Sequence, residues 1–193
     1  MNKAISLLIT ASFMGAAAEA QVQPGAVYPE FSATQNFLKL NNTSYRATLS
    51  AGLTQHSTLG FFISRTRYNA STVIGFDSYS TQSGAGVTYN YYRYFNSRSK
   101  WGWYVNAGAG LYTIKVYDKT SGTYQENNRY GQNELFVSPG IFFTPAKNVM
   151  VFAGTGGLSL ANNKYETFYL RSSLLGQFTL GVRITIGGGD KAK

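Results

Sequence analysis

Few residues of this chain have the types and spacing that catalysis requires. The single histidine, His56, precedes Ser57 in a short polar segment, and no carboxylate lies near either residue in the sequence. A serine nucleophile needs a base and an orienting group, and the Gly-x-Ser-x-Gly motif that exposes such a serine is absent. We therefore predict that the protein is not an enzyme, that it has no catalytic residue, and that His56 is a solvated turn residue.

The sequence also offers little to a metal ion or an organic cofactor. It has no cysteine, one histidine and only 8 acidic residues. Asp118, Glu126 and Asn127 share one polar segment with oxygen ligands of the kind that calcium prefers, but so few acids disfavour such a site. The Gly-rich segments lack the Lys-Ser/Thr that a phosphate-binding loop needs. We predict neither a metal site nor a cofactor.

Apolar and polar residues instead alternate with a period of two, most clearly in residues 169–186, YLRSSLLGQFTLGVRITI. Leu170, Leu174, Phe178, Val182 and similar residues alternate with a polar set that includes Arg171, Gln177 and Arg183. Successive strand side chains point to opposite faces, so this segment is a strand with one apolar and one polar face. It is long for a soluble strand and suits a membrane-spanning strand, which needs roughly 9 to 11 residues in the apolar zone.

Seven further segments show strand character, which gives an even count of eight. The segment at 58–68 does not reveal its phase, because Leu59, Phe61 and Ile63 are followed in the same phase by Arg65 and Arg67; a bulge or an exit from the apolar zone would explain this. The eight expected strands are 31–40, 44–53, 58–68, 81–95, 101–117, 133–144, 149–161 and 169–186.

The connections alternate in length, except that the first, 41–43, is also short. Short turns are expected at 54–57, 96–100 and 145–148, and longer polar loops at 69–80, 118–132 and 162–168. Short turns on one side and long loops on the other are typical of outer-membrane barrels, whose long loops face outward. We predict an all-β fold, an eight-stranded antiparallel transmembrane β-barrel in which closure removes exposed sheet edges.

The polar faces of these strands would meet in the lumen. Glu134 is the only acidic residue expected there, opposite several arginines, which would need amides, tyrosines or water as further partners. The interpretation that an eight-stranded barrel favours is a filled, stabilising polar core; the alternative is a narrow anion-preferring pore. The predicted lumen network comprises Arg46, Gln82, Asn90, Tyr104, Asn106, Glu134, Arg171, Gln177 and Arg183.

Aromatic residues gather at strand ends, as they do at membrane interfaces. Tyr89, Tyr91, Phe95, Trp101 and Trp103 flank the short turn 96–100 and are predicted to form an interfacial girdle. The longest loop carries Tyr124, Arg129 and Tyr130, which makes it the candidate loop for an extracellular partner.

The first 20 residues are typical of a cleaved signal peptide, with Lys3, an apolar stretch and Ala18-Glu19-Ala20 before the cleavage point. We expect an extended leader at 21–30, the barrel at 31–186 and a short tail at 187–193. The net charge of +9 comes from scattered basic residues without a dense run, so no nucleic-acid partner is predicted. The expected location is the bacterial outer membrane.

Several stretches, WGWYVNAGAGLY, LFVSPGIFFTPAKNVMVFAGTGGL and FTLGVRITI, resemble small bacterial outer-membrane β-barrel proteins of the OmpA-like transmembrane type. The resemblance covers roughly residues 31–186 and implies outer-membrane lipid and the barrel-insertion machinery as partners. Such barrels usually end on an aromatic residue, whereas this last strand ends on Ile186.

We predict a non-enzymatic barrel with a structural or surface-interaction role through its long loops, and two alternative functions remain. One is the anion-preferring pore. The other is a soluble exported barrel that carries an apolar ligand, with its apolar face turned inward. Alternation alone does not decide which face is inside, although the low share of charged residues, 13%, disfavours a soluble protein.

Overall fold

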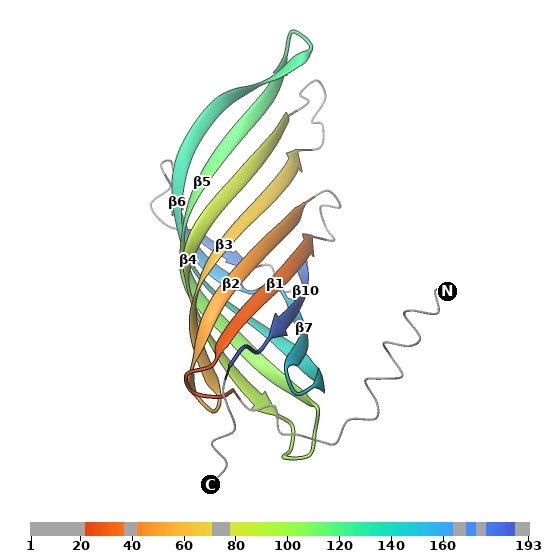
Figure 1. The fold of residues 1–193 in the computed structure, drawn as a ribbon. Helices are drawn as coiled ribbons and strands as arrows, with labels where there is room; N and C mark the ends of the chain where they lie inside the picture. The colour runs from red at the N-terminus through yellow and green to blue at the C-terminus, as the bar shows by residue number, and fades with distance from the viewer. Residues whose placement is uncertain (1–21, 37–41, 71–77, 164–168, 173–176, 188–193) are drawn as a thin grey trace, which may run out of the picture.

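The structure is a computed structural model that describes residues 22–36, 42–70, 78–163, 169–172 and 177–187. It is an antiparallel sheet that curls into a tall barrel (Figure 1). The predicted signal peptide at 1–20 lies outside the described residues. The strands are β1 (Val27–Asn36), β2 (Thr43–Thr54), β3 (Ser57–Ala70), β4 (Ser78–Tyr94), β5 (Trp101–Thr120), β6 (Thr123–Ala146), β7 (Val149–Thr155), β8 (Leu158–Asn163), β9 (Tyr169–Ser172) and β10 (Gln177–Ile184).

The barrel closes between its first and last strands. Each strand from β1 to β6 pairs with the next, and β1 also pairs with β10, with Phe31 opposite Val182. Strands β7 and β8 both pair with β6, while β10 pairs with β7 and β9 with β8. β7 and β8 are therefore the two halves of the seventh wall of the ring, and β9 and β10 are the two halves of the eighth. The prediction of an eight-stranded antiparallel barrel is confirmed.

The apolar face of the barrel points outward. Phe61 is 74% exposed, Phe31 71% and Leu111 69%, whereas Phe62, the inward neighbour of Phe61, is 2% exposed. Below the upper ends of β3–β6, exposed apolar residues recur at alternate positions of the strands and form an apolar band that lipid would cover. This placement excludes the soluble barrel with an apolar cavity, because the inner face carries most of the polar side chains.

Strand β3 keeps one phase from Leu59 to Arg67, with the odd-numbered residues outward. Of the two explanations for this segment, a bulge or an exit from the apolar zone, the structure selects the exit. Its register with β4 runs without a shift. The register irregularities lie elsewhere, near Leu53 in β2, near Asn127 in β6, and between Phe143 and Ala146 where β6 pairs with β7.

The prediction of a loop at 118–132 is wrong. β5 and β6 continue through most of it and pair up to Thr120 and Thr123, which leaves a two-residue turn of Ser121 and Gly122. Both turn residues have positive φ, 51° and 82°, as a type I′ hairpin requires. The resulting hairpin is the tallest part of the molecule in Figure 1. Polar composition suggested a loop here because both faces of a hairpin in water are polar.

The expected leader at 21–30 is also partly wrong, because β1 begins at Val27. Val22 and Ala26 are buried, 4% and 0% exposed, and belong to the main aromatic core cluster. The end of the barrel that carries the short turns is the lower end in Figure 1. The Gly25 amide donates to the Gly52 carbonyl at 3.0 Å, which fixes this segment against the rim at that lower end. The chain before β1 therefore helps to close the end of the barrel that carries the short turns.

No helix in the described part of the chain is long and apolar enough to cross a membrane.

Candidate functional site

The lower lumen is organised around Arg183 of β10, which is 2% exposed. Its Nη2 donates to Glu30 Oε2 of β1 at 2.8 Å and its Nε to the same oxygen at 3.2 Å. Nη2 also donates to the Tyr92 hydroxyl of β4. The guanidinium lies 4.3 Å from the Tyr92 ring centre and 5.4 Å from that of Tyr28. Cation–π contacts and a charge-assisted pair together offset part of the cost of burying this charge.

Aromatic rings surround this pair and fill the lower lumen. Tyr92 stacks on Tyr104 with centroids 5.9 Å apart and meets Phe142 edge-on at 5.8 Å. Phe152 lies edge-on to Tyr104 at 5.6 Å. All four rings are at most 7% exposed. An eight-stranded barrel is just wide enough to be filled by side chains, and these rings close its lower end.

Inward-facing glycines make room for these rings. A Cβ on Gly140 would meet the Tyr104 ring, and one on Gly181 would meet the Phe152 ring. The glycines that the sequence places in the polar phase thus provide space for large lumen side chains, which is the close packing expected of strand glycines.

The middle of the lumen is a polar layer without formal charge. Asn106 Nδ2 donates to both Thr88 Oγ1 and Asn90 Oδ1 at 2.5 Å. Asn90 Nδ2 in turn donates to Thr58 Oγ1 at 3.4 Å. Thr58, Thr88 and Asn90 are each at most 2% exposed. These bonds hold β3, β4 and β5 in register from inside and satisfy polar groups that would otherwise be costly to bury.

The upper lumen is looser and contains Arg46 of β2. The Arg46 guanidinium lies between two rings, 4.4 Å from the centre of Phe62 and 4.7 Å from that of Phe136. Glu134 and Arg46 both line two polar cavities of about 160 and 180 Å³. Cavities of this size have room for several waters. The lumen is therefore filled by side chains at its lower end and has room for water above.

The structure places eight of the nine predicted lumen residues on the inner face: Arg46, Gln82, Asn90, Tyr104, Asn106, Glu134, Gln177 and Arg183. Gln82 accepts a hydrogen bond from the Tyr68 hydroxyl at 2.7 Å. The side chain of Arg171 lies outside the described part of the structure. The assignment of Glu134 as the only inner acid is wrong, because Glu30 is also inside. Continuing the alternation of β1 back through Ser32 to Glu30 would have found it.

The aromatic residues named for the girdle lie on the outer wall at the lower rim. Tyr91 and Trp103 are 5.7 Å apart between ring centres, and Trp101 lies 4.7 Å from Phe143. Tyr89 and Phe95 are 42% and 61% exposed. His56 lies beside this group, 6.1 Å from the Tyr91 ring. Within the described ranges, no three His, Cys, Asp or Glu side chains gather closely enough to hold a metal ion.

The three candidate partner residues lie on strand β6 and not on a loop, and they do not share a face. Tyr124 and Arg129 point outward, whereas Tyr130 lies opposite the buried Ile114 on the inner face. Tyr124 joins a cluster that the sequence did not reveal. Tyr79 stacks on Tyr117 at 4.8 Å and meets Tyr124 edge-on at 5.1 Å.

No protein-family model matches the sequence, and no curated protein sequence is similar to it. Solved structures do match the fold. The major outer membrane protein of Thermus thermophilus aligns with a TM-score of 0.53 at 8% identity, over 84% of this chain and 99% of that chain. The N-terminal β-barrel domain of OprF from Pseudomonas aeruginosa gives 0.51 at 15% identity, over 85% and 99%. Neisserial surface protein A gives 0.47 at 17% identity, over 83% and 95%.

The architecture and the placement of apolar and polar faces define a transmembrane β-barrel. Its fold is that of the small outer-membrane barrels of the OmpA-like type, as the stretches quoted from the sequence predicted.

Proposed function

We propose that the protein is a non-enzymatic outer-membrane barrel that anchors and presents the β5–β6 hairpin at the cell surface. The observation that carries this proposal is the distribution of side chains. Apolar residues cover the outer wall, and the lower lumen is filled by Arg183, Glu30 and aromatic rings. A barrel that is closed inside and apolar outside has its upper hairpin as the main described surface available to a partner; residues 71–77 and 164–168 of the expected loops at 69–80 and 162–168 lie outside the described residues.

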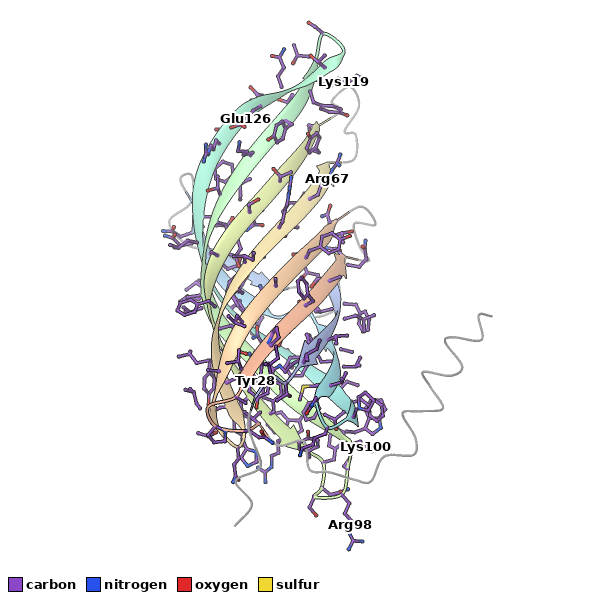
Figure 2. All side chains as sticks on the ribbon, viewed as in Figure 1. Tyr28, Arg67, Arg98, Lys100, Lys119 and Glu126 are labelled. Carbon is purple, nitrogen blue, oxygen red and sulfur yellow. The ribbon has the colours of Figure 1, made fainter. Side chains whose placement is uncertain are left out.

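The hairpin has a defined surface. Tyr117 and Tyr124 pack against Tyr79, and the Arg67 guanidinium lies 4.5 Å from the centre of the Tyr79 ring. Figure 2 shows Arg67, Lys119 and Glu126 in this upper part, far from Arg98 and Lys100 at the short turns. Tyrosines and arginines are common anchors in protein interfaces, because they bury large areas and also form hydrogen bonds.

Topology supports the orientation. Three short turns, at 54–57, 94–101 and 146–149, lie at the end where β1 starts and β10 finishes. The hairpin lies at the opposite end, which in such barrels faces outside the cell. We also propose export by cleavage of residues 1–20 and insertion by the outer-membrane assembly machinery, for which the alternating strands are the expected substrate.

Membrane fractionation with unheated and boiled gel samples tests the location. We expect recovery in the outer-membrane fraction and a mobility that shifts on boiling, because a closed barrel stays folded in detergent. Recovery in the soluble periplasmic fraction would contradict the proposal.

Replacing residues 118–125 by a Gly-Ser turn tests the role of the hairpin. The barrel should still insert and shift on boiling, whereas adhesion of the cells to host or abiotic surfaces should fall. A barrel with Arg98→Gln, a change at the opposite rim, should adhere like the unmodified protein. Equal adhesion of all three would remove the hairpin from the proposed function.

The narrow pore remains a second candidate because the upper lumen contains polar cavities beside Arg46. The described inner face contains two arginines, Arg46 and Arg183, and two glutamates, Glu30 and Glu134, so the described charges no longer show the excess that motivated anion preference. Planar-bilayer recordings of the unmodified barrel discriminate the two functions. We expect no conductance steps, and resolved steps with anion selectivity would favour the pore.

A further inference from the structure

Four basic side chains lie in two rows of residues on the outer wall at the upper end of β3–β6, three in the upper row and one in the lower row. Residues directly opposite one another on neighbouring strands define each row. The upper row runs Thr43, Arg67, Thr81, Lys115, Arg129, and the lower row runs Tyr45, Arg65, Ser83, Thr113, Gly131. Arg65, Arg67 and Arg129 are exposed and Lys115 is partly exposed. We call these four side chains the cationic rows.

The cationic rows contain a local conflict of charge. Lys115 and Arg129 are direct cross-strand partners on the same face, an arrangement that repels like charges. Glu126 forms an ion pair with Lys115 at 2.8 Å, with both side chains 35% exposed. Among the described residues it is the only acidic side chain on this outer face, which carries the four basic side chains of the cationic rows. An anionic ligand would relieve this repulsion.

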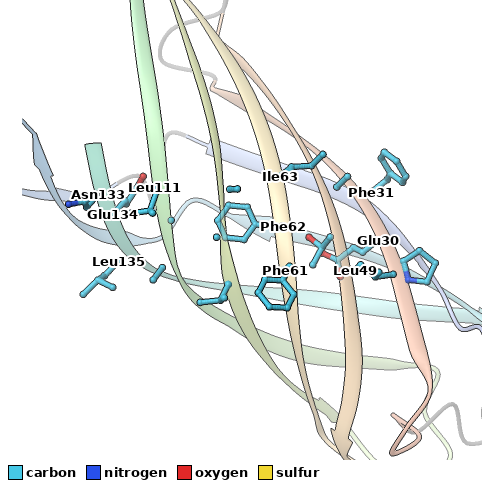
Figure 3. A pocket seen from close by; sticks show the side chains of 18 of the residues that line it. Glu30, Phe31, Leu49, Phe61, Phe62, Ile63, Leu111, Asn133, Glu134 and Leu135 are labelled. Carbon is cyan, nitrogen blue, oxygen red and sulfur yellow. The ribbon is translucent and has the colours of Figure 1, made fainter. Parts of the chain in front are cut away.

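The next row down is apolar and contains a groove. From β2 to β5 it runs Ala47, Ile63, Ala85, Leu111, so small and large side chains alternate around the wall, and it ends on the polar Asn133 of β6. Together with the row below, these residues line an outer apolar groove of about 930 Å³ (Figure 3). Figure 3 shows Ile63, Leu111 and Phe61 among the side chains that line it. The groove lies on the lipid-facing wall, where only apolar chains would be in contact with it.

The spacing of charge and groove matches the layers of a lipid leaflet. Two residues along a strand cover roughly 6.6 Å, so Arg65 lies one such step beyond Ile63 and Arg67 two steps beyond. Tyr45, which is directly opposite Arg65, is 63% exposed and is suited to the interface between chains and head groups. The cationic rows thus lie at head-group height and the groove lies at acyl-chain height.

We propose that the outer wall of β2–β6 is a binding site for a phosphorylated lipid of the outer leaflet. The phosphate contacts Arg65, Arg67, Lys115 and Arg129, and an acyl chain lies in the groove beneath them. This inference rests on the proposed membrane location and orientation. Arg provides paired donors that match phosphate oxygens, and basic residues near a membrane surface attract anionic lipid. A soluble polyanion would use the charges but not the groove.

Electron paramagnetic resonance of spin-labelled lipids tests the site. The full barrel is reconstituted in phosphatidylcholine bilayers with a trace of labelled phosphatidylglycerol or labelled phosphatidylcholine, and the motionally restricted fraction reports lipid on the wall. We expect the anionic label to be preferred by about threefold or more, with the preference falling as salt rises. In the variant R65Q/R67Q/K115Q/R129Q the two labels should bind equally. The control R98Q/K100Q, at the other end of the barrel, should keep the preference.

A second variant tests the groove separately. Ala85→Phe places a large apolar side chain between Ile63 and Leu111, which a lipid-facing wall tolerates. We expect it to lower association of the anionic label about twofold or more. Unchanged association would remove the groove from the proposal.

Three results distinguish the possible failures. An equal anionic preference in the quadruple variant and the unmodified barrel would overturn the proposal. Retention on a sulfated polysaccharide that depends on the four cations, without any lipid preference, would overturn it in favour of a soluble polyanion. Each sample is checked for membrane insertion and for a mobility shift on boiling, so failure of the proposed barrel function would be visible independently.

Discussion

Arg183 on the last strand and Glu30 on the first form an ion pair at 2.8 Å between residues that are 153 positions apart in the chain. The side chain of Arg183 is 2% exposed and that of Glu30 is 11% exposed. The two residues are also direct partners in the β1–β10 register. The pair therefore lies across the seam that converts a sheet into a barrel, and it makes closure electrostatically specific.

Breaking this pair from one side should be costly. Glu30→Gln leaves Arg183 buried without its carboxylate, so we expect a loss of about 3–5 kcal/mol in the free energy of unfolding. The double variant E30L/R183M removes both charges and should lose much less, since no unpaired charge remains. Urea titration of the folded gel band measures both. As a control, Lys100→Gln should have little effect, and equal losses in the single and double variants would contradict the argument.

The lower aromatic layer should be the barrier to ions. Replacing Tyr92 and Phe142 by alanine removes two rings that are at most 4% exposed and opens space toward the upper lumen. We expect conductance steps in planar bilayers from Y92A/F142A and none from the unmodified barrel. The variant must still shift on boiling. A folded Y92A/F142A barrel without conductance would place the barrier elsewhere in the lumen.

Inward glycines should be intolerant of even one methyl group. Gly140→Ala would press a Cβ against the Tyr104 ring, and we expect it to cost about 1–3 kcal/mol through overpacking. Gly131→Ala lies on the same strand but faces outward, and its nearest atom would be 4.0 Å away. That matched variant should be close to neutral. Urea midpoints of the two variants compare them directly, and similar midpoints would show that the ring can move aside.

The exposed Lys115–Glu126 pair should matter little for stability. Both side chains are 35% exposed, so water and salt screen the attraction. We expect Glu126→Gln to change the free energy of unfolding by less than about 1 kcal/mol. If the cationic rows bind phosphate, the same variant should also strengthen the preference for anionic lipid in the spin-label assay. A large loss of stability would instead give this pair a structural role.

Much of the barrel could be predicted because its signal is local. Alternation in segments such as Tyr104 to Leu111 is a property of one strand, and it assigns residues to two faces without knowledge of any neighbour. The lumen positions of Asn90, Asn106 and Arg183 follow from that alternation. The same rule failed for the β5–β6 hairpin beyond Asp118, because a strand with water on both sides has no apolar face to reveal it.

The sequence by itself determined the strand class, the alternation of faces and the absence of catalytic spacing, since each depends on residues close together in the chain. The tertiary structure alone decided which face is outside and which distant residues meet. Glu30 contacts Arg183, and Arg65 and Arg67 lie on the same part of the outer wall as Lys115 and Arg129, only when the strands pair in one register. Register and closure are collective properties of the whole sheet, because a shift by one residue in any strand would turn every side chain of that strand to the other face.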